Sequence, residues 1–295
     1  MAHTLQNEHW QADILPDLGA SIANARFRYS GNWIDIIRPM DVWGASGSFL
    51  MLPWANRIRS GKLVFDGETH QLKTRTDENT ARHGDVRKRQ WHVLEQHETV
   101  GRYRFDSAEA DGFNWPFTLT SEQTFQLEDA DFVWGVSLTN TDSRPFPAGF
   151  GFHPYFQRHA PNMPMLHVPC NQQFVLRDNM PDAYPIPVQP QYDFREPRQV
   201  DAGVMMDHLF TGCDTNQPLR LIYEDWNLTL EIHRDPIFAY TLVFTAPDGT
   251  LAVEPQTNAT DGFNLMRNGI EDNGVFVLQP GETVSGEVRL RLVTT

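Results

Sequence analysis

Five short segments of the chain set ionisable residues beside glycine, proline or aromatic residues, where side chains often carry chemistry. They are residues 53–58, 82–84, 151–156, 206–210 and 253–257. Most of the ionisable residues in these segments could also have purely structural roles, such as a buried histidine in the core or an aspartate in a turn. Glu254 fits such a role less well, because it follows the apolar run Leu251-Ala252-Val253. A carboxylate at the end of a buried strand is costly unless something pairs with it. Glu254 is therefore the first candidate functional residue.

Familiar catalytic motifs are missing from the sequence. There is no G-x-S-x-G nucleophile elbow, no phosphate-binding loop, no dinucleotide fingerprint and no H-E-x-x-H zinc motif. Nothing in the sequence indicates that the protein binds a nicotinamide, a flavin or a nucleotide. One metal hypothesis stays open, a zinc site of two imidazoles and one carboxylate built from His83, His153 and Glu254.

Taken together, the segments resemble the sequence blocks of the aldose 1-epimerase (galactose mutarotase) family. Asn56-Arg57-Ile58 with Gly61 is similar to its N-R-I-x-x-G block, and His83-Gly84 with Trp91 to its H-G block. Residues 152–156, Phe-His-Pro-Tyr-Phe, are similar to its H-P-Y-F block, and residues 251–257 to its E-P-Q-T block. The four blocks stand in the family's order and span about residues 53–264. The match around Asp207 is weaker.

The resemblance implies a fold, a reaction and a set of site residues. The fold is an all-β galactose mutarotase-like β-supersandwich, a single large domain with an open concave cleft. The reaction is interconversion of the α and β anomers of a hexose, with no metal and no organic cofactor. By the same resemblance, Glu254 is the general base and His153 the general acid. Arg57, His83 and Asp207 hold sugar hydroxyls.

The reaction makes chemical sense of these residue types. To open the hemiacetal, a base removes the proton of the C1 hydroxyl while an acid protonates the ring oxygen. The aldehyde then turns about the C1–C2 bond, and the ring closes on its other face. A carboxylate is a suitable base and an imidazolium near neutral pH a suitable acid. Glu254 would need its pKa tuned by burial or by a neighbour such as Arg57.

Three other functions compete with the mutarotase. An epimerase of a phosphorylated or otherwise anionic sugar would need extra cations, for which the basic cluster Arg82, Arg87, Lys88 and Arg89 is the local candidate. A non-catalytic sugar-binding protein on the same fold would not need an acid/base pair. A glycoside-cleaving enzyme would need a second carboxylate opposite Glu254, and Asp207 is the one that can be nominated.

The elements that must position these residues read as β-strands. Apolar and polar residues alternate from Trp134 to Leu138, from Leu228 to Ile232 and from Val288 to Leu292. Asp-Gly and Pro-Gly turn signals recur at 66–67, 111–112, 248–249 and 280–281. No stretch of 12 or more residues has a persuasive helical period. These features predict one all-β domain over residues 1–295 with little helix.

Proline and tryptophan add two further expectations. Eleven of the 20 prolines lie between Pro145 and Pro197. Because proline cannot donate to a central ladder, this region is expected to hold loops or edge strands that shape the rim of the cleft. Among the eight tryptophans, Trp54 is the best placed to stack on a sugar, although a core position is the more common role.

Composition and charge limit the kinds of molecule that the protein is expected to bind. The formal net charge of −14 disfavours binding to nucleic acid, and no apolar run reaches the roughly 20 residues that span a membrane. Cys170 and Cys213 are too few for a disulfide framework and fit a reducing compartment. With no signal peptide at Met1, the chain is expected to be cytoplasmic. The expected partner is a small-molecule sugar, and the expected assembly a monomer or homodimer.

Overall fold

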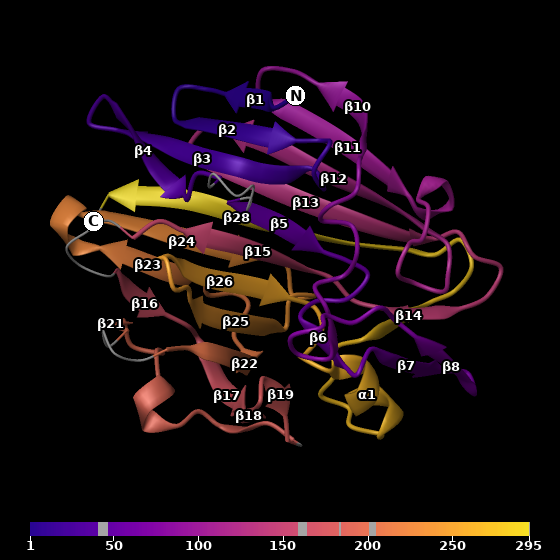
Figure 1. Cartoon of the computed structure of the whole chain (residues 1–295). Helices are drawn as coiled ribbons and strands as arrows, with labels where there is room; N and C mark the ends of the chain where they lie inside the picture. Colours follow the sequence, from indigo (N-terminus) through magenta and orange to yellow (C-terminus); the bar gives the residue numbers. More distant parts are fainter. Residues whose placement is uncertain (41–46, 159–163, 183, 201–204, 295) are drawn as a thin grey trace.

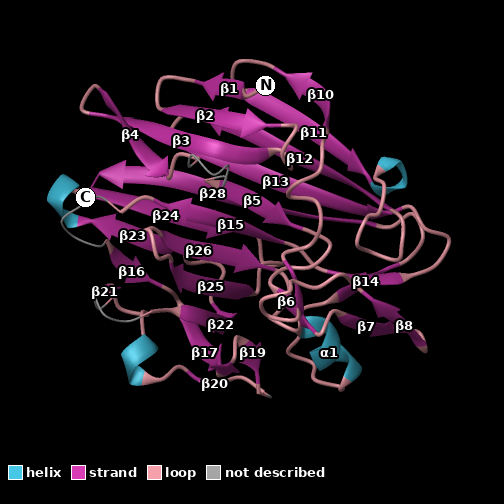
Figure 2. Cartoon of the chain, viewed as in Figure 1, coloured by secondary structure: helices cyan, strands magenta, loops and turns pink. Residues whose placement is uncertain are grey.

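The chain forms two large antiparallel sheets that pack face to face, with short ribbons and one helix at one end (Figures 1 and 2). The computed structural model describes residues 1–40, 47–158, 164–182, 184–200 and 205–294. Strands dominate these residues, as the period-two patterns predict, and the described part holds one α-helix, α1 (Gly262–Arg267). Three short 3-10 turns lie at Ser107–Glu109, Pro190–Tyr192 and Glu224–Trp226.

The first sheet has eleven strands and carries the candidate site. Ten of them pair in the order β1-β2-β3-β4-β15-β26-β25-β22-β17-β20, and β5 pairs with both β15 and β3. Their bounds are β1 His3–Gln6, β2 Trp10–Leu15, β3 Ser21–Tyr29, β4 Asn32–Ile37, β5 Ser48–Met51, β15 Gly151–Phe156, β17 Cys170–Phe174, β20 Ile186–Pro187, β22 Asp207–Cys213, β25 Tyr240–Thr245 and β26 Leu251–Gln256.

The second sheet has nine strands in the order β10-β11-β12-β13-β28-β24-β23-β16-β21. Their bounds are β10 His92–Gln96, β11 Val100–Asp106, β12 Leu119–Glu128, β13 Asp131–Asn140, β16 Met165–His167, β21 Arg198–Gln199, β23 Leu219–Tyr223, β24 Leu228–Arg234 and β28 Thr283–Thr294. The three alternating segments found in the sequence are parts of β13, β24 and β28. Their apolar residues are buried, as predicted.

Four two-stranded ribbons complete the structure. They pair β6 (Arg57–Arg59) with β9 (Thr80–Arg82), β7 (Lys62–Phe65) with β8 (Glu68–Gln71), β14 (Phe146–Ala148) with β27 (Phe276–Leu278), and β18 (Leu176–Arg177) with β19 (Met180–Pro181). The predicted turns at 66–67, 111–112, 248–249 and 280–281 all lie in turns or bends.

One large cluster of buried side chains joins the two sheets. It includes Ile22 and Phe152 from the first sheet, and Trp134 and Leu290 from the second. The rings of Trp134 and Phe152 lie 4.2 Å apart across the interface, which ties the site-bearing sheet to its partner. A side chain on the opposite face of the first sheet is therefore held on a rigid support.

The expectation that the proline-rich region holds only loops or edge strands was wrong for Pro154, and a second proline outside that region behaves in the same way. Pro154 lies inside β15 and Pro255 inside β26, and both strands are central in the eleven-stranded sheet. The pairing of β15 with β26 is recorded at Gly151↔Gln256 and again at Tyr155↔Ala252, but not between them. A proline has no N–H to donate, so the gap in the ladder falls at the two prolines. His153 and Glu254 stand beside that gap.

The two cysteines also depart from expectation. Cys170 and Cys213 are register partners on β17 and β22, and a disulfide joins them. The sequence separation of 43 residues gave no sign of this pairing. A disulfide is more typical of an oxidising compartment than of the expected reducing one, so a cytoplasmic location stays a prediction. In the described part of the chain, no helix is long and apolar enough to cross a membrane.

Candidate active site

The site lies on one row of side chains across the first sheet. Phe49 of β5 is the register partner of His153 on β15, and Leu242 of β25 is the partner of Glu254 on β26. His153 and Glu254 face each other across the interrupted ladder between β15 and β26. The row thus runs Phe49, His153, Glu254, Leu242, with neighbouring strands about 4.8 Å apart.

Glu254 and His153 are in direct contact. The Oε1 atom of Glu254 lies 3.1 Å from Nε2 of His153, and the side chains are only 1% and 5% exposed. The other carboxyl oxygen, Oε2, accepts a hydrogen bond of 2.8 Å from Nε2 of Gln256. Nδ1 of His153 has no hydrogen-bond partner among the described residues. The structure therefore brings together the two residues predicted to transfer protons.

Burial moves the pKa values of this pair toward each other. Desolvation raises the pKa of Glu254 well above 4.5, and the charge of Asp207 raises it further. Desolvation also lowers the pKa of His153 well below 6.5, and the nearby charge of Arg87 adds to the effect. Both shifts favour the neutral forms, a protonated carboxyl group on Glu254 and a neutral imidazole on His153. A buried neutral pair avoids the cost of burying two charges.

Arg57 enters the site from the ribbon of β6 and β9. Its Nη1 lies 3.5 Å from Oδ2 of Asp207, and its Nε donates a 3.0 Å hydrogen bond to Oε2 of Glu78. The same Glu78 pairs with Arg82, the register partner of Arg57, at 2.8 Å. Burial raises the pKa of Asp207, and the positive charge of Arg57 opposes that shift. Arg57 and Asp207 are thus held together as predicted, with Glu78 as an additional anchor.

His83 is fixed by an unusual backbone. Its φ is +64°, a left-handed conformation, and its N–H donates to the carbonyl of Asn56 at 2.7 Å. The next residue, Gly84, also has a positive φ, and a Cβ there would lie 1.9 Å from the carbonyl oxygen of Leu52. Glycine is required at position 84 for this close approach. The result is that the His83 ring meets His153 edge-on, with centroids 5.1 Å apart.

Aromatic rings frame His153 on two sides. The rings of Phe49 and Tyr155 each lie 4.6 Å from the imidazole, centroid to centroid. Burial raises the pKa of Tyr155 to about 12, with a further contribution from Glu254, so the phenol stays neutral. Trp54, by contrast, is wholly buried and stacks on Trp115 at 5.5 Å. The idea that Trp54 stacks on a sugar is therefore wrong, and its more common role as a core residue holds.

These side chains enclose a polar cavity of about 170 Å³. All five predicted site residues line it. Its wall is completed by Asn56, Arg82, Tyr155, Leu242 and Phe244. The zinc hypothesis is not supported, because the described residues hold no group of three or more histidine, cysteine, aspartate or glutamate side chains placed for a metal ion. The cavity instead presents proton donors and acceptors beside the apolar side chains of Leu242 and Phe244.

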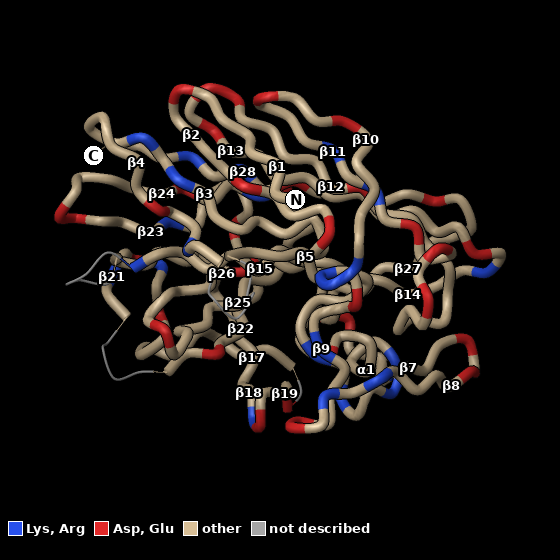
Figure 3. Tube along the Cα trace, turned by 45° about the horizontal axis from the view of Figure 1, so that its top comes forward, with Lys and Arg blue, Asp and Glu red and all other residues tan. Residues whose placement is uncertain are grey.

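The four residues of the basic cluster, Arg82, Arg87, Lys88 and Arg89, have different surroundings in the structure. Arg82 lines the cavity, and Arg87 lies beside Phe49 with its guanidinium carbon 5.0 Å from the ring centroid. Arg89 instead pairs with Asp85 at 2.5 Å, and Lys88 is exposed. Figure 3 shows this basic segment as a blue stretch near β5. Two of the four cations therefore belong to the surroundings of the site.

Comparison with known proteins identifies the family and the fold of the chain. The family model described as aldose 1-epimerase matches residues 1–291. The chain belongs to the aldose 1-epimerase family. Solved aldose epimerase-like structures share the fold. A homologue from C. elegans matches with a TM-score of 0.85, 18% identity and coverage of 100% and 99% of the two chains. A galactose mutarotase-like protein from Clostridium acetobutylicum matches with a TM-score of 0.87, 16% identity and coverage of 99% and 95%.

Two Escherichia coli K12 proteins, both described as uncharacterized, are similar in sequence to this chain. YihR is 22% identical over 222 residues, which is 73% of this chain and 71% of YihR. YphB is 21% identical over 290 residues, which is 89% of this chain and 91% of YphB. Both similarities extend over most of each chain.

Sequence reasoning missed several residues of the site. Glu78, which holds both Arg57 and Arg82, lies in no recognisable motif. Gln256 and Tyr155 were inside the quoted segments but received no role. A signal for Gln256 existed, because residues two apart on a strand share a face and Gln256 therefore stands beside Glu254.

Proposed function

We propose that this protein is an aldose 1-epimerase that interconverts the α and β anomers of a hexose by acid/base ring opening and reclosure. The observation that carries the proposal is the 3.1 Å contact between Glu254 and His153, both buried at the cavity wall. An acid/base pair that shares one proton suits a reaction in which one proton is taken and one is given.

The proton balance of the cycle follows from that pair. Before ring opening, the proton of the pair passes from Glu254 to His153 across their 3.1 Å contact. The carboxylate of Glu254 then takes the proton of the C1 hydroxyl, and the imidazolium of His153 gives a proton to the ring oxygen. This leaves a neutral glutamic acid and a neutral imidazole, the arrangement that burial favours in the free site. Ring closure returns both protons by the reverse route, on the other face of the aldehyde. Each positioned proton transfer contributes about 10²–10⁴-fold.

The remaining polar groups would hold the sugar. Arg57 offers a planar set of N–H donors and Asp207 offers acceptors, a combination that suits neighbouring hydroxyl groups. His83 stands beside His153, with its Nδ1 unpartnered among the described residues. In this proposal the substrate is a free small-molecule sugar, the chain works as a monomer or homodimer, and no metal or organic cofactor takes part.

The test is direct measurement of anomer exchange. Saturation-transfer NMR on equilibrated aldoses, or polarimetry on freshly dissolved α-anomers, should show exchange faster than in buffer alone. Glu254→Gln protein at the same concentration is the control for adventitious buffer catalysis. Sugar binding by calorimetry without any acceleration of exchange would contradict the proposal and favour the non-catalytic sugar-binding alternative.

A further inference from the structure

Arg87 differs from the other arginines near the site in its partners. The others each have a carboxylate in contact, in the pairs Arg38–Asp248, Arg57–Asp207, Arg82–Glu78 and Arg89–Asp85. For Arg87 no carboxylate contact is found among the described residues. Its guanidinium rests on the Phe49 ring instead, at 5.0 Å. Stacking on a ring face leaves the N–H groups of a guanidinium available to another ligand.

The backbone that carries Arg87 is firmly held. Gly19, with a φ of +72°, lies so close that a Cβ there would be 2.4 Å from the carbonyl oxygen of Arg87. The Gly19 N–H donates to the carbonyl of Arg89 at 2.7 Å, and Gln123 donates to the carbonyl of Gly19 at 2.9 Å. The backbone of Arg87 is therefore held in place and does not belong to a free loop.

Its position continues the row of the site. From the base, the row passes from Glu254 to His153, then to Phe49 at 4.6 Å and to Arg87 at 5.0 Å from Phe49. Burial lowers the pKa of Arg87, and the charges of Arg82 and Arg75 lower it further. Beyond Phe49, the row therefore ends in a positive charge, that of Arg87, which no described carboxylate contacts.

The proposed function fixes which end of a sugar points along this row. Glu254 acts on the C1 hydroxyl and His153 on the ring oxygen. In a hexopyranose the ring oxygen is bonded to C1 and C5, and C5 carries C6. A sugar with its C1 hydroxyl at Glu254 and its ring oxygen at His153 therefore directs C6 toward Phe49 and Arg87.

We infer that the preferred substrate is an aldohexose with an anionic group at C6, and that Arg87 binds this group beside the Phe49 ring. The inference rests on the proposed function, because the roles of Glu254 and His153 set the direction of the sugar. Phosphate, sulfonate and carboxylate share the required chemistry, a negative charge with several acceptor oxygens for a guanidinium.

The experiment compares anomer exchange for four sugars of one configuration: the neutral hexose, its 6-phosphate, its 6-sulfonate and its uronic acid. For the wild-type protein we expect kcat/KM to be at least tenfold higher for one or more of the anionic sugars than for the neutral one. In Arg87→Met the anionic-to-neutral ratio should fall about 10–100-fold, the size expected for a charged hydrogen bond. Arg87→Lys keeps the charge without the fork, so its ratio should fall less. Lys88→Met removes one charge from the neighbouring exposed position and should leave the ratio unchanged.

The outcomes separate this inference from the proposed function. Exchange of the neutral hexose with no preference for any anionic sugar overturns the inference and leaves the mutarotase proposal standing. The same holds if Arg87→Met and Lys88→Met change the ratio equally, because the effect would then be one of general surface charge. Acceleration of none of the four sugars overturns the proposed function and this inference with it.

Discussion

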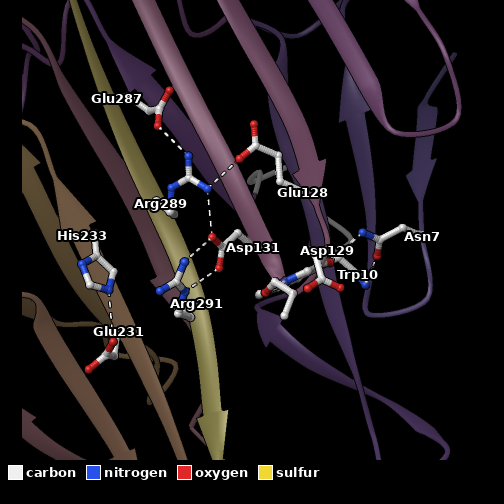
Figure 4. A network of polar contacts seen from close by, with 11 residues as sticks. Asn7, Trp10, Glu128, Asp129, Asp131, Glu231, His233, Glu287, Arg289 and Arg291 are labelled. Carbon is white, nitrogen blue, oxygen red and sulfur yellow. Dashed lines mark hydrogen bonds and ion pairs between the residues drawn. The ribbon is translucent and has the colours of Figure 1, made fainter.

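Carboxylates meet basic side chains in two parts of this protein that differ in their access to water. On the outer face of the nine-stranded sheet, Asp131 accepts two hydrogen bonds of 2.7 Å from Arg291 and one of 2.9 Å from Arg289 (Figure 4). Arg289 also contacts Glu128 and Glu287. We call these five residues the outer network. In the cavity, Glu254 meets a single imidazole at 3.1 Å.

The pKa values of Asp131 and Glu254 shift in opposite directions. Hydrogen bonds from Arg291 lower the pKa of Asp131, which keeps it charged. Desolvation raises the pKa of Glu254, which keeps a proton on it. Charged groups that satisfy one another on a partly exposed face are typical of structural roles, whereas a buried carboxyl group with a raised pKa can exchange a proton with a substrate. The contrast predicts that substitutions in the two places have different consequences.

The largest effect is expected at the acid/base pair. Glu254→Gln and His153→Asn should each lower kcat about 10²–10⁴-fold, because each removes one proton carrier. The double variant should be little slower than the slower single variant, since the two groups act as a unit. Asp131→Asn, the matched change in the outer network, should leave kcat unchanged. Wild-type exchange rates in well-folded Glu254→Gln protein would remove the chemical distinction between the two regions.

Arg57 should affect binding more than chemistry. Arg57→Ala removes N–H donors that suit sugar oxygens but no transferred proton, so KM should rise about 10–100-fold with nearly constant kcat. Steady-state exchange kinetics over a range of sugar concentrations separates the two constants. A collapsed kcat with unchanged KM would instead make Arg57 an electrostatic partner of Glu254.

Stability should depend on pH differently in the two regions. Well above pH 6.5 the unfolded chain holds almost no proton on Glu254 or His153, while the folded pair is expected to hold one. The free energy of unfolding should therefore fall as pH rises, by about 1.4 kcal/mol per pH unit, until the folded pair loses its proton. Glu254→Gln should abolish this slope. Asp131 has the opposite effect, because its pKa is lower in the folded protein than in the unfolded chain. The ionised Asp131 therefore stabilises the fold at pH values above the pKa of the unfolded state, and this stabilisation is lost only in acid.

Urea unfolding of wild type, Glu254→Gln and Asp131→Asn between pH 6.5 and 9 measures these slopes. Asp131→Asn should keep the wild-type slope, since Asp131 is ionised in both states over this range. Equal slopes in wild type and Glu254→Gln would show that the folded pair holds no extra proton.

Gln256 should tune the pair without transferring a proton. Its hydrogen bond lowers the pKa of Glu254, opposing desolvation. Gln256→Met should therefore shift the alkaline limb of the kcat/KM profile to higher pH and lower the maximum by up to about tenfold. A pure loss of protein stability, with the limb unmoved, would make Gln256 a packing residue only.

The smallest effect is expected at the edge of the outer network. Arg291 is 46% exposed, and exposed ion pairs contribute about 0–1 kcal/mol. Arg291→Gln should lower the free energy of unfolding by less than about 1 kcal/mol, less at high salt, with no change in kcat. Urea unfolding at two salt concentrations checks this. A loss of activity would link the outer network to the cavity.

Much of this arrangement is visible in the sequence, for identifiable reasons. Period-two alternation and Asp-Gly turns are local properties, so they indicate the strands of both sheets. The blocks around Arg57, His83, His153 and Glu254 are local too. The ladder interruption at Pro154 and Pro255 was not predictable, because it depends on which strands become neighbours. The same holds for Glu78, whose two arginine partners come from a ribbon pairing, and for the disulfide between register partners on β17 and β22.

The close contact between Gly84 and Leu52 has a consequence for mutational scanning. Any side chain at position 84 must displace the Leu52 carbonyl and the strained backbone that aims His83. A scan scored by activity alone would therefore rank Gly84 with Glu254, although glycine has no side chain that can touch a sugar. Melting temperatures recorded beside the activities would tell the two positions apart, because Gly84→Ala should melt earlier, whereas Glu254→Gln should fold and fail only in turnover.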